Sequence, residues 1–141
     1  MGRFLIDTNV ISELARPEPH AAVVEWVEAT EPESLFVSMI TIGEIRRGIH
    51  LHPDAVRRAR LDRWLRATLT EWFEGRVPAL DLAVAERWAV LSARARQTGR
   101  PLPAIDGLIA ATASAHDLTL VTRNVADIQG SEVDVLNPWA P

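Results

Sequence analysis

The sequence predicts a single α/β domain over residues 1–141, built on a parallel sheet of four to five strands with helices on its faces. Two observations lead to this fold class. Short apolar runs such as FLI and SLFVS alternate along the chain with longer segments whose apolar residues recur at helical spacing. No repeat, low-complexity tract or linker divides a chain whose length is ordinary for one domain.

The first half of the chain is expected to form two strands and four helices. The helix over residues 20–30 shows the pattern, because Val23 and Val27 share one face while Glu25 and Glu28 lie on the other. The expected strands are residues 3–6 and 34–38, and the expected helices are residues 9–15, 20–30, about 41–49 and about 54–73.

The second half is expected to add three strands and two helices. A helix over residues 82–98 is closed by Gly99, and an alanine-rich helix follows the proline-marked loop within residues 100–117. Strands separated by helices indicate a parallel sheet. The expected strands here are residues 76–80, residues 118–122 and an edge strand at 132–136.

The composition excludes several classes of protein. The chain has no cysteine, so disulfides, zinc–thiolate sites and cysteine nucleophiles are absent. All fifteen basic residues are arginine, which excludes Schiff-base enzymes and P-loop NTPases, because both need a lysine. No apolar run is long enough to span a bilayer, so a cytoplasmic protein without membrane association is expected. The net charge of −4 argues against a general coat of nucleic acid.

Acidic and amide side chains are expected to meet at one edge of the sheet. Asp7 directly follows the first strand, where we expect it to have no required capping duty, and Glu44 lies in the first turn of the helix after the second strand. Asp106 begins a helix that leads back into the sheet, and Thr122 and Asn124 follow the strand at 118–122. In open α/β sheets, ligands bind at the carboxyl ends of the strands.

Each of these residues also has a purely structural interpretation. Thr41 and Glu44 have the spacing of a capping box, and Asp106 could cap its helix after the proline-rich loop. Asn124 and Asp127 could serve turns. Asp7 is harder to explain this way, since a carboxylate at the end of an internal strand loses water and needs a partner.

Three carboxylates at one edge repel one another and are stable as ions only around a cation. All-oxygen coordination selects a hard metal such as Mg²⁺ or Mn²⁺. Such a metal activates water and stabilises charge on a phosphoryl group, which points to phosphodiester hydrolysis.

The motifs FLIDTNVISEL, SMITIGEIRRGI, PAIDGLIAATASAHDLTLVTRN and VADI before LNPW resemble those of the PIN-domain ribonucleases. More narrowly, they are similar to the VapC-type toxins of bacterial toxin–antitoxin modules. The resemblance runs in order over essentially the whole chain. It implies an acidic Mg²⁺ or Mn²⁺ site that cleaves RNA, a homodimer, and a small antitoxin that blocks the site.

The resemblance also assigns roles to individual residues. The fourth family position is often Asp, whereas this chain has Asn124, which leaves the site one charge weaker and puts a second tightly held metal in doubt. The metal ligands carried over by motif are Asp7, Glu44 and Asp106, and these three with Asn124 are the implied catalytic residues. The implied supporting residues are Thr8 and Asn9, which would orient Asp7, together with Thr122 and Asp127.

Two other functions are weighed. An aspartate-nucleophile phosphatase would explain Asp7, but it requires a second acid where this chain has Asn9, and it requires a lysine. A non-catalytic relative that binds RNA or a partner without cutting is supported only by Asn124.

Overall fold

A four-stranded parallel sheet forms the centre of the structure, a computed structural model that describes residues 2–128 and 132–140. Its strand order is β2-β1-β3-β4, so the first strand lies inside the sheet. Phe4 of β1 pairs with Leu35 of β2 and with Thr119 of β3. The strands are β1 (Phe4–Ile6), β2 (Leu35–Val37), β3 (Thr119–Val121) and β4 (Val135–Leu136). The predicted fold class is confirmed.

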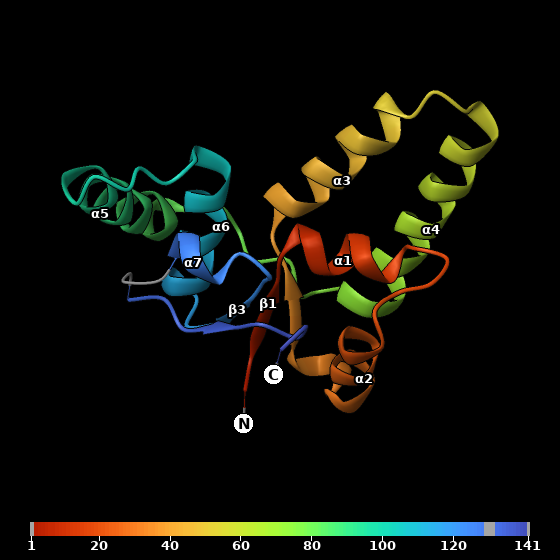
Figure 1. Cartoon of the computed structure of the whole chain (residues 1–141), viewed down its shortest axis with the longest axis horizontal. Coiled ribbons are helices and arrows are strands. Elements are labelled where there is room, and N and C mark those ends of the chain that lie inside the picture. The colour runs from red at the N-terminus through yellow and green to blue at the C-terminus, as the bar shows by residue number, and fades with distance from the viewer. Residues whose placement is uncertain (1, 129–131, 141) are drawn as a thin grey trace.

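Helices cover the sheet in two groups, one on each side of it in Figure 1. Helices α1, α2 and α4 lie on one side, and α5, α6 and α7 lie on the other, while α3 and α4 extend together as an arm. No helix in the described part of the chain is long and apolar enough to cross a bilayer. The helices are α1 (Thr8–Leu14), α2 (Ala21–Ala29), α3 (Met39–Leu51), α4 (Ala55–Phe73), α5 (Leu82–Gln97), α6 (Ala104–Ala115) and α7 (Val125–Ile128), with a 3-10 turn at Pro32–Ser34.

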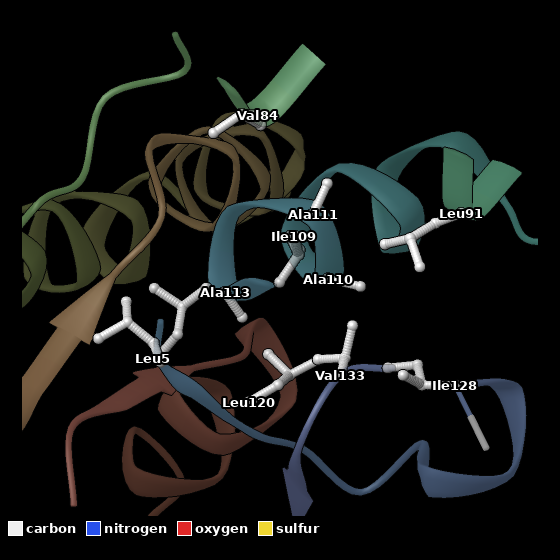
Figure 2. Close-up of a cluster of buried hydrophobic side chains, with 11 residues drawn as sticks. Leu5, Val84, Leu91, Ile109, Ala110, Ala111, Ala113, Leu120, Ile128 and Val133 are labelled. Atoms are coloured by element: carbon white, nitrogen blue, oxygen red, sulfur yellow. The ribbon is translucent and has the colours of Figure 1, made fainter. Parts of the chain in front are cut away.

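The core is divided by the sheet, as the alternation of side chains along each strand requires. Leu5 and Leu120 face α6, where Ile109 and the alanines of the helix pack on them (Figure 2). Ile6 and Val121 face the opposite cluster, which is contributed mainly by α1, α2 and α4. The small side chains of α6 let its backbone approach the strands closely. This contact places the start of α6 near the carboxyl ends of β1 and β3.

The strand predicted at residues 76–80 is wrong. The N–H of Val37 donates to the carbonyl of Arg76 (3.1 Å), and Arg76 Nε donates to the carbonyl of Leu35 (2.9 Å). Pro78 has no N–H with which to extend these contacts into a ladder, so the segment runs past the edge of β2 without joining the sheet.

Candidate functional site

Asp7 lies at the carboxyl end of β1 and is only 7% exposed. Its Oδ1 accepts a hydrogen bond from the backbone N–H of Thr8 (2.7 Å), and its Oδ2 accepts one from the hydroxyl of Thr122 (2.7 Å). Asp7 is the N-cap of α1, so the expectation that it has no capping duty is wrong. Burial raises the pKa of Asp7, the two hydrogen bonds lower it, and the charge of Glu44 raises it further, so that the net pKa is raised.

Thr8, which follows Asp7 in the sequence, holds the side chain of Glu44 by a hydrogen bond. The Thr8 hydroxyl donates to Glu44 Oε1 (2.7 Å), and Thr41 Oγ1 lies 3.3 Å from Thr8 Oγ1. The capping-box interpretation of Thr41 and Glu44 is wrong, because α3 begins earlier. Ser38 caps α3 by accepting from the N–H of Ile40 (3.0 Å). Thr41 is therefore a buried residue within the helix, and Glu44 is available to the site.

Thr122 connects three segments through one hydroxyl group. Its oxygen accepts from Asn9 Nδ2 (3.1 Å) and from the N–H of Asn124 (3.1 Å). With both lone pairs occupied, the hydroxyl proton is directed at Asp7. Asn9 also accepts from the N–H of Arg123 (3.4 Å), which ties α1 to the turn after β3. The side chain of Asn124 is exposed and is not the part of the residue that bonds to Thr122.

Asp106 lies close enough to Asp7 and Glu44 for their charges to act on it. It lies in the first turn of α6, whose N-cap is Pro103, and it makes no capping bond, so the alternative that it caps the helix is wrong. Partial burial raises the pKa of Asp106, and the charges of Asp7, Glu44 and Asp127 raise it further. Asp127 lies in α7, which replaces the turn that the sequence suggested, and its charge reaches the same group.

The carboxylate oxygens of Asp7, Glu44 and Asp106 are donors of the kind that a hard divalent cation accepts. Across residues 2–128 and 132–140, no three acidic or histidine side chains stand close enough to enclose a metal by themselves. In the same residues, no arginine or histidine forms a direct ion pair with Asp7, Glu44 or Asp106. Mg²⁺ is commonly held by one or two carboxylates with several waters retained, which suits this arrangement.

A further buried acid was not singled out in the sequence. Glu13, at the other end of α1, is 6% exposed and accepts from the N–H of His20 (3.1 Å) and from Arg16 (3.3 Å). Burial acts to raise its pKa, but the hydrogen bonds from His20, Arg16 and Trp139, together with the positive charge of Arg16, outweigh burial and lower the pKa. Nothing in a single sequence separates this satisfied glutamate from one that awaits a ligand.

The chain is similar to known proteins over nearly its whole length. The family model described as PIN domain matches residues 4–126. The chain is 38% identical to VapC ribonuclease Y4jK of Sinorhizobium fredii, over 97% of this chain and 98% of the relative. It is 38% identical to toxin FitB of Neisseria gonorrhoeae, over 96% and 97% of the two chains.

Solved structures show the same likeness. FitAcB from Neisseria gonorrhoeae superposes with a TM-score of 0.92 at 37% identity, covering 98% of this chain and 99% of that one. A toxin–antitoxin complex from Klebsiella pneumoniae superposes with a TM-score of 0.73 at 27% identity, covering 95% and 96% of the two chains.

Proposed function

The chain belongs to the PIN-domain family, and from this premise we propose that it is an endoribonuclease toxin of the VapC type, which cleaves RNA with the help of Mg²⁺ or Mn²⁺. The observation that carries the proposal is the buried Asp7 beside Glu44. Its raised pKa reflects a carboxylate removed from water and placed near other acids without a cationic partner. Such a group costs stability unless a cation binds it.

The residues divide the work between holding an ion and orienting its ligands. Asp7, Glu44 and Asp106 are the proposed ligands, and Asn124 is a proposed assisting group that orients water or substrate. Thr8 and Thr122 fix the two nearest carboxylates by donating hydrogen bonds to them, and Asn9 holds Thr122 in place. A divalent ion held by Asp7, Glu44 and Asp106 would supply Lewis acidity toward a phosphoryl group and would lower the pKa of a bound water.

The experiment is cleavage of single-stranded RNA by the purified protein, with chelator and with added Mg²⁺ or Mn²⁺. Cleavage is expected only with the added ions, and an Asp106→Asn variant prepared in the same way should be inactive with them. Cleavage that persists in chelator at full rate would contradict the metal-dependent function, and so would an active Asp106→Asn variant.

A non-catalytic relative is the second candidate, and two observations favour it: Asn124 replaces an acid, and no three acids enclose a ready-made cage in the described residues. A non-catalytic protein would bind RNA without cutting it under every ion. The same assay, read as binding and cleavage together, separates the two candidates.

We propose that a small antitoxin blocks the site with an arginine, because guanidinium forms paired hydrogen bonds with carboxylates. A hollow of about 300 Å³ has Thr8, Glu44 and Trp64 in its wall. Trp64 also borders a second, apolar hollow of about 240 Å³ between α1, α2 and α4. An inhibitory segment with an apolar stretch beside an arginine would fit both. Exchange of that arginine for alanine in the neighbouring small gene product should restore toxicity on co-expression.

A homodimer in the cytoplasm is also proposed, on the strength of the family. Leu82 at the start of α5 is 75% exposed, and Leu80 is 39% exposed, which is the kind of apolar surface that a second copy would cover. Sedimentation of the wild type and of Leu82→Glu tests this, since the charged variant should shift toward monomer.

A further inference from the structure

A basic hollow lies next to the acidic site and has no part in the function proposed so far. Its volume is about 530 Å³, which falls within the roughly 300–1,000 Å³ typical of small-ligand sites. The wall comes from the second half of α5, the proline-marked loop at residues 98–103, and α7, which lie on the same side of the sheet in Figure 1. The residues that matter here are Leu91, Arg94, Thr98, Arg100, Leu102 and Ile128.

The hollow and the acidic site share a border. Asp127 lines the hollow, and it is also close enough to Asp106 for its charge to act there. Pro103 lines the hollow as well, and it is the N-cap of α6, three residues before Asp106. A strand of RNA whose scissile phosphate lies at the acidic site would therefore reach the hollow with the adjoining nucleotide.

One side of the hollow is cationic and the other is apolar, which suits the phosphate and the base of a nucleotide. Arg94 and Arg100 contribute cationic groups suited to a phosphate, and Thr98 contributes a hydroxyl. Leu91 and Ile128 lie at the same end of the core cluster in Figure 2, and they give the hollow an apolar side suited to a base. In a chain with net charge −4, paired arginines beside an acidic centre give local attraction for RNA.

The arginines are available to a phosphate. Arg94 pairs with Glu132 at 3.4 Å, but the two side chains are 60% and 70% exposed, and such a surface pair contributes little. Leu102 of the loop behind them and the ring of Trp88 approach Gly107 of α6 closely, since a Cβ on Gly107 would lie 3.5 Å from Leu102 and 3.2 Å from the ring. The absence of that Cβ lets α6 pack directly against the wall of the hollow.

We propose that this hollow, here called the arginine pocket, binds the nucleotide of the RNA substrate next to the bond that is cut, with Arg94 and Arg100 contacting its phosphate. The inference rests on the proposed ribonuclease function and adds a substrate subsite to it. An acidic peptide of a protein partner also suits two arginines, but the shared border with Asp106 favours the substrate.

The test compares the double variant Arg94→Ala/Arg100→Ala with the control Arg87→Ala/Arg96→Ala. The control removes the same charge from exposed positions of α5 that do not line the pocket. Kinetics of RNA cleavage are measured at several salt concentrations. The pocket variant should raise KM roughly tenfold or more with little change in kcat, and flatten the log–log salt dependence by about 0.7 per lost phosphate contact. The control should stay within about twofold of the wild type on the same scale.

Shortened substrates give a second measurement. Removal of one nucleotide from one end of a minimal RNA should raise the KM of the wild type by a similar factor. The KM of the pocket variant should hardly change on that removal. Arg94→Lys/Arg100→Lys should recover the salt dependence while binding less tightly, since lysine keeps the charge but not the paired geometry.

The outcomes separate the two levels of inference. A wild type that does not cut RNA overturns the proposed function. If the wild type cuts RNA and the pocket and control variants have the same kinetics as each other, the subsite alone is overturned. A pocket variant that cuts RNA normally but escapes the antitoxin assigns the pocket to a protein partner, which also overturns it.

Discussion

The two ends of helix α1 each hold a buried glutamate or aspartate, and the two carboxylates are in opposite conditions. Asp7 at its start and Glu13 in its last turn are 7% and 6% exposed. The pKa of Asp7 is raised by burial and by the charge of Glu44. Against the effect of burial, hydrogen bonds from His20, Arg16 and Trp139 and the positive charge of Arg16 lower the pKa of Glu13. The comparison shows that two acids of similar exposed fraction can have pKa values shifted in opposite directions, according to the balance of desolvation against the hydrogen-bond donors and cationic charge around each.

The largest difference should appear in activity. Asp7→Asn should reduce RNA cleavage by at least about a hundredfold, because it removes the charge on which the cation depends. Glu13→Gln should leave cleavage near the wild-type rate and lower the melting temperature instead, since it weakens contacts that join α1 to the following loop and to Trp139. Equal loss of activity in the two folded variants would remove the distinction.

The pH dependence of stability should differ in sign between the two acids, measured in chelator. The lowered pKa of Glu13 stabilises the fold above the unfolded value of 4.5, and this contribution is lost as the pH falls through the folded value. The raised pKa of Asp7 means that the fold is stabilised below the unfolded value of 3.8 and loses that contribution as the pH rises through the folded value.

These signs predict opposite trends in a melting series between about pH 3 and 8. As the pH rises, the melting temperature of Asp7→Asn should increase relative to that of the wild type. The melting temperature of Glu13→Gln should decrease relative to that of the wild type. Parallel curves for the wild type and Asp7→Asn would mean that Asp7 carries no unfavourable charge.

A smaller effect is expected from the hydroxyl that directs its proton at Asp7. Thr122→Val keeps the shape of the side chain but removes the hydrogen bond to Asp7 and the acceptor used by Asn9 and Asn124. Cleavage should fall roughly tenfold. Thr122→Ser keeps the hydroxyl and should recover most of that loss, which distinguishes orientation of Asp7 from simple packing.

The smallest effect should come from Asn124. An amide brings no charge to a cation, and the bond from Asn124 to Thr122 uses the backbone N–H. Asn124→Ala should therefore reduce cleavage by less than about tenfold, and by less than Asp106→Ala does. If the two variants lose equal activity in a side-by-side assay, Asn124 has a larger part than an assisting group.

Much of this arrangement was predictable from sequence, because strands and helices alternate with clear periodicity. The convergence of Asp7, Glu44 and Asp106 followed from the rule that parallel strands end at one edge. The capping box at Thr41 was not resolved correctly, because Ser38 offers a competing cap only three residues earlier. The strand predicted at residues 76–80 rested on apolar spacing, and Pro78, which lacks the N–H that a ladder needs, was the residue in the sequence that argued against it.

Tertiary partners were beyond the reach of the sequence. The bond from Thr122 to Asp7 spans 115 positions, and the link from Thr8 to Glu44 spans 36. The arginine pocket joins α5 to α7 in the same way. The first contact follows from the pairing of β1 with β3, in which Ile6 lies opposite Val121, and the others depend on how the helices pack. The pattern of a single chain specifies neither the pairing nor the packing.

The central claim, that the carboxylates around Asp7 form a cation site, is tested most directly by thermal melting near neutral pH in chelator, Mg²⁺, Mn²⁺ and Ca²⁺. A site that binds only the folded chain adds about 2.7 kcal/mol at a hundredfold excess over its dissociation constant, or roughly 5–10 °C for a chain of this size. The wild type should melt higher with each ion, Ca²⁺ included, because its looser geometry still accepts these oxygens. Asp7→Asn should lose most of the shift. A wild type whose melting is indifferent to millimolar divalent ions would contradict the claim.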